Sequence, residues 1–132
     1  MHGYLPERDG VFMGLSLLEA LATKGCGLTD ALRDLEKRYG RFVYARRDLT
    51  LSFEQVKRAF DRLTGSPPKQ IADVTVRDVN TLDGVKLIGA DDSWILFRRS
   101  GTEPIVRVYA ESSSQPRVNR LLDAAVSLVQ SA

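Results

Sequence analysis

Residues 94–109 read Trp94-Ile95-Leu96-Phe97-Arg98-Arg99-Ser100-Gly101-Thr102-Glu103-Pro104-Ile105-Val106-Arg107-Val108-Tyr109. Two apolar runs flank seven polar or loop-forming residues, which predicts two β-strands joined by a loop over 98–104. In the second run, period-two alternation places Val106 and Val108 on one face of the strand and Arg107 on the other. Because strands this close in sequence pair antiparallel, the segment predicts an antiparallel sheet.

The flanking segments predict an α+β domain over residues 41–132. The capping box Ser52…Gln55 predicts the start of one helix, and Pro116 fits the first turn of another. The expected elements are a strand at 41–51, a helix at 52–64, strands near 74–76, 85–88, 94–97 and 105–110, and a helix after 112–114. This order predicts an antiparallel sheet of about four or five strands with two amphipathic helices covering one face.

The first 40 residues predict two helices and no strand. Asp9 is the expected N-cap of a helix over about 11–23, whose apolar residues lie on every side. A helix of this kind belongs in the interior of a larger structure, so we expect the part that covers it to precede this chain. A second helix, with Thr29 as its expected N-cap and one apolar stripe, ends at Gly40.

The composition argues against several classes of protein. The 132 residues include 19 basic and 17 acidic side chains, a net charge of +2 that is too balanced to predict nucleic-acid or membrane binding. Apolar residues make up 43% of the chain, enough for a packed core. The single cysteine, Cys26, excludes an intramolecular disulfide and fits a reducing compartment, and no secretory signal is recognised. We therefore expect a cytoplasmic protein.

No set of side chains in the sequence predicts a catalytic or metal centre. His2 is the only histidine, and one histidine with one cysteine cannot form a zinc site or a nucleophilic triad. The acidic pair Asp91-Asp92 is typical of a solvated turn. We assign no catalytic residue and no metal ligand to this chain.

The loop over 98–104 contains the groups that bind a phosphate dianion. Arg98 supplies a planar guanidinium, and Ser100 and Thr102 supply hydroxyl donors. Gly101 permits a positive φ, which would let consecutive N–H groups converge on an anion. Arg107, on the next strand, can turn toward the same ligand. The alternative is an ordinary hairpin loop with a solvated arginine.

The run from Arg98 to Pro104, followed by Arg107-Val108-Tyr109, resembles the signature of the last domain of the α-D-phosphohexomutases. This superfamily includes phosphoglucomutase/phosphomannomutase and phosphoglucosamine mutase. The stretch 82–86 (Leu-Asp-Gly-Val-Lys) resembles the strand that precedes the phosphate loop of the family. The stretch 6–10 (Pro-Glu-Arg-Asp-Gly) resembles the segment after the sugar-recognition loop of domain 3, and it favours the phosphoglucomutase/phosphomannomutase group.

The resemblance implies a fold and a function. Residues 41–132 would be domain 4, with a TATA-binding-protein-like topology, and residues 1–40 the C-terminal helices of a truncated α/β domain 3. Such enzymes interconvert hexose 1-phosphate and hexose 6-phosphate through a phosphoserine, Mg²⁺ and a bisphosphorylated sugar. Domain 4 holds the phosphate that is not being transferred. The residues implied in this role are Arg98, Ser100, Gly101, Thr102 and, as a further candidate, Arg107, while Glu103 and Pro104 shape the loop.

The other functional parts of the family are missing from this sequence. The chain contains no phosphoserine loop, no aspartate-rich magnesium loop and no sugar-recognition loop. We therefore expect the fragment alone to be inactive, with a hexose phosphate and the missing domains 1–3 as its partners, and neither nucleic acid nor a membrane. The sequence does not identify the preferred sugar. The alternatives are a nucleic-acid- or protein-binding module of similar fold and a natural stand-alone interaction domain.

Overall fold

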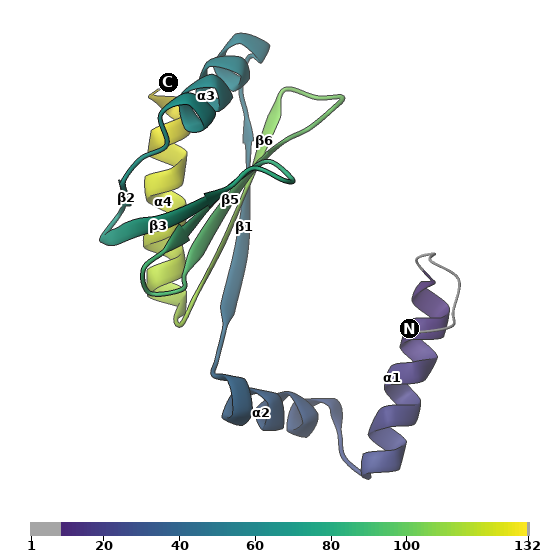
Figure 1. The fold of residues 1–132 in the computed structure, drawn as a ribbon. Coiled ribbons are helices and arrows are strands. Elements are labelled where there is room, and N and C mark those ends of the chain that lie inside the picture. Colours follow the sequence, from purple (N-terminus) through teal and green to yellow (C-terminus); the bar gives the residue numbers. More distant parts are fainter. Residues whose placement is uncertain (1–8, 132) are drawn as a thin grey trace. The chain divides into compact units, whose positions relative to one another are not determined.

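The computed structural model describes residues 9–131, and the chain divides after Gly40 into two compact units. The first unit contains α1 (Gly10–Lys24) and α2 (Leu28–Tyr39) (Figure 1). The Asp9 carboxylate accepts a hydrogen bond from the Phe12 N–H at 2.8 Å, which confirms the predicted N-cap. The second helix begins differently from the prediction, because its N-cap is Gly27 rather than Thr29.

The two helices of the first unit bury none of their residues. In α1 the exposed apolar side chains include Val11 and Leu15 on one side of the helix and Met13 and Leu17 on the opposite side. Among the described residues, no single helix is long and apolar enough to cross a bilayer. Taken together across a bend of 82°, α1 and α2 meet the same length and hydropathy test, which core helices of soluble proteins also meet.

The second unit is an antiparallel sheet with two helices, so the predicted α+β class is confirmed (Figure 1). The sheet order is β1-β6-β5-β4-β3-β2. It has six strands because the two-residue β2, which the sequence did not predict, pairs with β3. The elements are β1 (Val43–Thr50), α3 (Phe53–Gly65), β2 (Gln70–Ile71), β3 (Val74–Asn80), β4 (Val85–Gly89), β5 (Trp94–Arg99), β6 (Ile105–Ser112) and α4 (Gln115–Gln130).

The core of this unit lies between the sheet and the helices α3 and α4. Helix α4 packs mainly on β6 and β1, and α3 packs on α4 and β4. Every second residue of the central strands faces the helices, and Phe97, Val106 and Val108 are fully buried there. Burying a large apolar side chain contributes about 1.5–3 kcal/mol, so these positions fix which face of each strand is covered. We call the opposite face, which neither α3 nor α4 covers, the open face.

Local signals in the sequence set the start of α3 as predicted. The Ser52 hydroxyl accepts a hydrogen bond from the Gln55 N–H at 3.2 Å, and the Gln55 side chain accepts one from the Ser52 N–H at 2.9 Å. Helix α3 therefore starts immediately after β1. The N–H of Leu51, between them, donates to the carbonyl oxygen of Pro104 at 2.9 Å, which ties this connection to the loop after β5.

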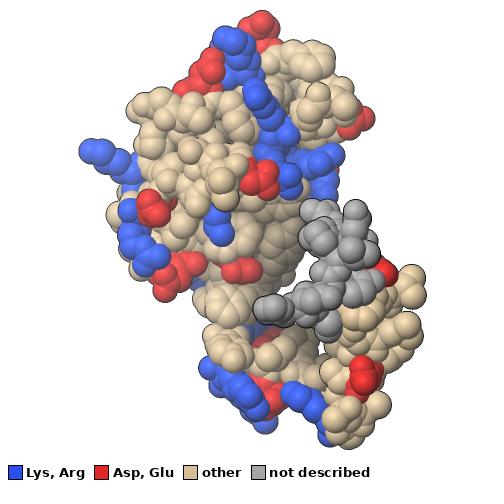
Figure 2. All heavy atoms as spheres, turned by 45° about the vertical axis from the view of Figure 1, so that its right-hand side comes forward, with Lys and Arg blue, Asp and Glu red and all other residues tan. Residues whose placement is uncertain are grey.

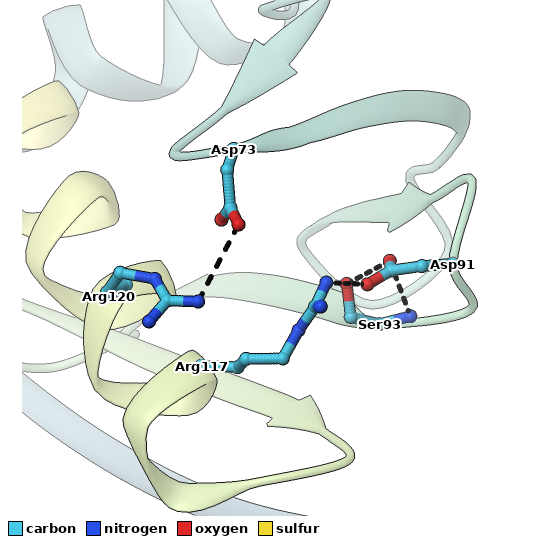
Figure 3. Close-up of polar contacts among 5 residues, drawn as sticks. All are labelled: Asp73, Asp91, Ser93, Arg117 and Arg120. Carbon is cyan, nitrogen blue, oxygen red and sulfur yellow. Dashed lines mark hydrogen bonds and ion pairs between the residues drawn. The ribbon is translucent and has the colours of Figure 1, made fainter.

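An ion-pair network joins α4 to two turns of the sheet (Figure 3). Arg117 of α4 pairs with Asp91, which also accepts hydrogen bonds from the Ser93 hydroxyl at 2.5 Å and the Ser93 N–H at 3.2 Å. Arg120, one turn along α4, lies 3.6 Å from Asp73. Burial opposes ionisation of Asp91, but the Ser93 donors and Arg117 outweigh it, so the pKa of this carboxyl is below its usual value.

The turn before β4 approaches the end of β5 very closely. Gly84 has a φ of +100°, and a Cβ atom at this position would collide with the carbonyl oxygen of Phe97 and lie 3.1 Å from Cγ of Arg98. Only glycine adopts this positive φ without strain and has no Cβ atom to collide with the Phe97 carbonyl. The Asp83-Gly84 turn signal is thus a tight contact between two strands.

We expect Gly84→Ala to lower the free energy of unfolding by at least about 2 kcal/mol, because the new methyl group meets backbone at a left-handed φ. Gly101→Ala is the matched control, since a Cβ there meets nothing within 4 Å. It should cost less than about 0.5 kcal/mol. Urea unfolding followed by Trp94 fluorescence measures both, and equal stabilities would contradict the requirement at Gly84.

We expect Asp91→Asn to be less stable than the parent chain by about 1 kcal/mol near pH 6, because Arg117 loses its carboxylate. Since the folded pKa of Asp91 is lowered, its contribution is complete above the unfolded value of about 4 and is lost as the pH falls through the folded value. The difference in free energy of unfolding between Asp91→Asn and the parent chain should therefore decrease toward pH 3 and below. Urea unfolding at pH 6 and pH 3 tests this, with Asp92→Asn as the control, and a gap that is equal at both pH values would refute it.

Candidate functional site

Arg98 and Arg107 are direct cross-strand neighbours on β5 and β6. Arg98 directly follows Phe97, and Arg107 directly precedes Val108. Both of these apolar residues are fully buried against the helices. Side chains alternate along a strand, so both arginines project on the open face of the sheet. The structure thus brings together two of the predicted site residues.

Carboxylates flank the two arginines on the neighbouring segments. On β1, Asp48 is the cross-strand partner of Arg107. On the other side, Asp83 lies in the turn before β4, and its Oδ1 is 3.2 Å from Nη2 of Arg98. Asp48, Arg107, Arg98 and Asp83 therefore form a charged row across the sheet, with the two positive charges in the middle.

The two arginines of the charged row differ in their partners. The Arg98 side chain has an ion pair with Asp83, whereas the Arg107 side chain has no hydrogen bond or ion pair within residues 9–131. The Nε atom of Arg107 is shielded from solvent and still lacks an acceptor. Like charges directly opposite each other destabilise an antiparallel pair, and a shielded donor without a partner adds to that cost. An anion bound between the two guanidinium groups would relieve both.

Asp48 does not neutralise Arg107, because Arg46 already binds it. The Arg46 Nε donates to Asp48 at 2.6 Å, and a second nitrogen of Arg46 donates to the other carboxylate oxygen. This hydrogen bonding holds the pKa of Asp48 below its ordinary value despite partial desolvation, and the charge of Arg107 contributes less. The same pair raises the pKa of Arg46. Both carboxylate oxygens of Asp48 are therefore engaged by Arg46, and the Arg107 guanidinium remains available to a ligand.

The loop after β5 is held by few backbone hydrogen bonds. Ser100 donates its N–H to the carbonyl oxygen of Ile105 at 2.9 Å, and Ile105 donates to that of Glu103 at 2.7 Å. The Thr102 N–H lies 3.5 Å from Oγ of Ser100, at the limit of a hydrogen bond. Within the described residues, the N–H groups of Gly101 and Glu103 have no acceptor. Unpaired backbone donors thus lie next to the charged row.

Gly101 departs from the expected conformation. Positive φ values occur at Gly25, Gly40 and Gly84 among the glycines of the described chain, and not at Gly101. A left-handed nest centred on this residue is therefore not formed in the structure. Gly101 is exposed and leaves open space beside its backbone, so its contribution to a ligand site would be access to the N–H group.

Two surface hollows flank the loop. One of about 460 Å³ lies between α3 and the turn before β4, and Asp83 and Arg98 line it. The other, of about 560 Å³, lies between the loop and α3, and Ser100 and Gly101 line it. Arg99 lines both, because it points to the helix side of β5. Neither hollow contains all five predicted residues, because Arg98 lines the first, Ser100 and Gly101 line the second, and Thr102 and Arg107 line neither.

Asp83 is the residue that sequence reasoning missed. Its stretch was recognised as a turn and as part of the family resemblance, but no role at the site was given to its carboxylate. The signal was present in the register, because Val85 pairs with Phe97, so the preceding turn must lie beside Arg98. Only the fold of the hairpin makes this neighbour visible.

An aromatic cluster occupies the far part of the open face. Tyr44 is stacked on Tyr109 with ring centroids 6.2 Å apart, and its ring is 6.5 Å from that of Trp94. Lys86 Nζ lies 4.0 Å from the ring centre of Trp94, and the guanidinium of Arg46 lies 5.6 Å from that of Tyr109. The sequence did not show this grouping of aromatic and basic residues.

Charged side chains are mixed in sign over the visible surface (Figure 2). The carboxylates of the Asp91-Asp92 turn are both engaged, Asp91 by Arg117 and Asp92 by Arg77 at 2.9 Å. Among residues 9–131 there is no group of three or more histidine, cysteine or acidic side chains that could hold a metal ion. The candidate ligand of this surface is therefore an anion at the charged row and loop.

Comparisons with known proteins agree on one family. The family model described as the phosphoglucomutase/phosphomannomutase C-terminal domain matches residues 32–128. A phosphoglucosamine/phosphogalactosamine mutase of Sulfurisphaera tokodaii is 33% identical over 132 residues, covering 98% of this chain and 26% of the relative. A protein of Pyrococcus abyssi named a probable phosphoglucosamine mutase is 32% identical over 124 residues, covering 94% of this chain and 26% of its own length. The chain thus spans about a quarter of the length of the curated relatives it matches.

A solved structure gives the same fold. The crystal structure of a phosphoglucomutase/phosphomannomutase family protein from Burkholderia thailandensis matches with a TM-score of 0.62 at 24% identity. The match covers 93% of this chain and 24% of that protein.

The stretch 6–10 favoured the phosphoglucomutase/phosphomannomutase group of the superfamily. Its first three residues lie outside the residues that the structure describes. By the match over residues 32–128, this chain belongs to the phosphoglucomutase/phosphomannomutase C-terminal domain family.

Proposed function

We propose that residues 41–132 are the phosphate-clamping domain 4 of a phosphohexomutase. The parent enzyme would be an intramolecular phosphotransferase that interconverts hexose 1-phosphate and hexose 6-phosphate through a phosphoserine and a bisphosphorylated sugar. In this proposal residues 1–40 are the C-terminal helices of domain 3. The family membership, the length of the relatives and the charged row support this assignment.

The single observation that supports the clamp most directly is the pairing of Arg98 with Arg107. Two guanidinium groups on facing residues of neighbouring strands destabilise the empty sheet, and Arg107 has no partner within the described chain. A phosphate dianion offers several acceptor oxygens and can engage both groups. Ser100, Gly101 and Thr102 follow Arg98 on the same hairpin and would add hydroxyl and N–H donors.

The clamp binds and orients the substrate, and the chemical steps would take place elsewhere in the parent enzyme. The proposed phosphoserine and Mg²⁺ site belong to the parts outside this chain, and residues 9–131 offer no cluster of ligands that fits such an ion. No step of the reaction is therefore assigned to these residues, and the fragment alone is proposed to be inactive. The proposed substrate class is a hexose phosphate, with the sugar left open between glucose, mannose and glucosamine. A cytoplasmic location remains part of the proposal.

We expect inorganic phosphate and glucose 1-phosphate to shift the amide resonances of Ser100, Gly101 and Thr102 in the 132-residue chain. In the isolated chain the contacts proposed for the other domains are missing, so a dissociation constant of about 1 mM is expected. Arg98→Ala should weaken binding at least about tenfold, because a charged hydrogen-bond donor is lost. The control Arg77→Ala removes an exposed arginine from the pair with Asp92 and should leave the affinity unchanged. If the parent chain shows no shifts, or if Arg98→Ala shows equal shifts, the assignment of the phosphate clamp is wrong.

We expect Arg107→Gln to separate binding from stability. The substitution removes the repulsion from Arg98 and the shielded Nε donor, so the free energy of unfolding should stay the same or rise by up to about 1 kcal/mol. Phosphate affinity should fall about fivefold or more, since a charged donor is lost from the site. Urea unfolding and the phosphate titration measure the two quantities on the same sample. A stability loss with unchanged affinity would mean that Arg107 is only structural.

A further inference from the structure

Asp83 is held in a fixed position beside Arg98. The turn that contains it is closed on one side by a hydrogen bond from the Leu82 N–H to Oδ1 of Asn80 at 2.9 Å. On the other side Gly84 leaves no room for a Cβ against the Phe97 carbonyl and the Arg98 stem. The backbone on both sides of Asp83 is thus constrained, which places the carboxylate beside the Arg98 guanidinium.

The ion pair between Asp83 and Arg98 is exposed, and a ligand can easily replace the carboxylate. One carboxylate oxygen lies 3.2 Å from one terminal nitrogen of Arg98, so the contact is a single ion pair. The side chains are 43% and 70% exposed, so a ligand can reach both. Exposed ion pairs of this kind contribute little free energy. A dianion that can also reach Arg107 and the loop donors would therefore replace Asp83 at Arg98.

We propose that Asp83 is a built-in competitor for phosphate at Arg98, occupying the guanidinium when the clamp is empty and returning to it when the phosphate leaves. This inference rests on the proposed function, because it concerns regulation of the same site. The carboxylate neutralises Arg98 in the absence of ligand, which lowers the cost of placing two arginines side by side. Because the empty state is stabilised in this way, phosphate binding is weakened and release is faster.

A weak hold suits the reaction proposed for the parent enzyme. In that proposed reaction the clamp would hold whichever phosphate is not being transferred, so it would have to release one phosphate before it holds the other. A carboxylate that takes the place of the departing phosphate stabilises the empty state of the clamp. The asymmetry of the charged row fits this role, since the carboxylate pairs with Arg98 and leaves Arg107 open to the first contact.

The test compares Asp83→Asn with the parent 132-residue chain in titrations with inorganic phosphate at constant ionic strength, followed by amide shifts. Asparagine fits a turn before glycine, so the fold should be kept, and the amide spectrum checks it. We expect the dissociation constant to fall about two- to fivefold, the range that exposed ion pairs are worth. Asp92→Asn, which removes the same charge from the similarly exposed Arg77 pair, should leave the affinity unchanged. An unchanged or weakened affinity in Asp83→Asn overturns the proposal.

A double-variant cycle separates competition at Arg98 from simple repulsion across space. In an Arg98→Ala background, Asp83→Asn should change the initial slope of the phosphate titration by less than about 1.5-fold if the carboxylate acts through Arg98. The same gain in both backgrounds would overturn competition in favour of repulsion alone. The ligand-free Arg98 Nε–Hε resonance provides a readout without phosphate, and it should shift in Asp83→Asn. If the parent chain and the variant both fail to bind phosphate while this resonance moves, the proposed function fails together with the inference. Binding by the parent chain with no effect of Asp83 overturns the inference alone.

Discussion

Burial of the helix-facing side of the β5–β6 hairpin determines everything else about this surface. Phe97, Val106 and Val108 have no exposed area, and α4 packs against their strands. Because strand side chains alternate strictly, fixing these residues inside forces Arg98 and Arg107 to the open face at facing positions. A shift of one residue in register would bury both guanidinium groups, which costs far more than their repulsion. The core thus maintains an electrostatically unfavourable pair that a ligand can relieve.

Local and periodic features of the fold were predictable from the sequence. The capping box at Ser52, the N-cap at Asp9 and the alternation along 105–110 each depend on residues a few positions apart, and the structure confirms them. The family resemblance rested on a contiguous signature and is confirmed as well. The loop residues were named from their chemistry, and their roles in binding stay predictions.

The features that sequence reasoning missed depend on distant contacts or on context. Strand β2 is two residues long and too short to show a pattern, and it exists because β3 offers it a partner. Thr29 has a better capping side chain than Gly27, yet the chain enters α2 at the glycine. Gly101 is able to adopt a positive φ and does not need one in this loop. The contact of Asp83 with Arg98 follows from a hairpin register, which no local signal specifies.

The charges on β1 have a consequence for association. β1 forms one end of the six-stranded order and pairs with β6 alone, so one side of its backbone has no strand partner in the unit 41–132 (Figure 1). An eight-residue strand with free backbone groups is a template for pairing with a second molecule. Its middle is Arg46-Arg47-Asp48, with Arg46 bound to Asp48 and Arg47 lying 2.6 Å from Asp123 of α4. Charged side chains on an edge strand disfavour pairing with a second molecule, so Arg46 and Asp48, which lie beside the anion site, also act against aggregation at this edge.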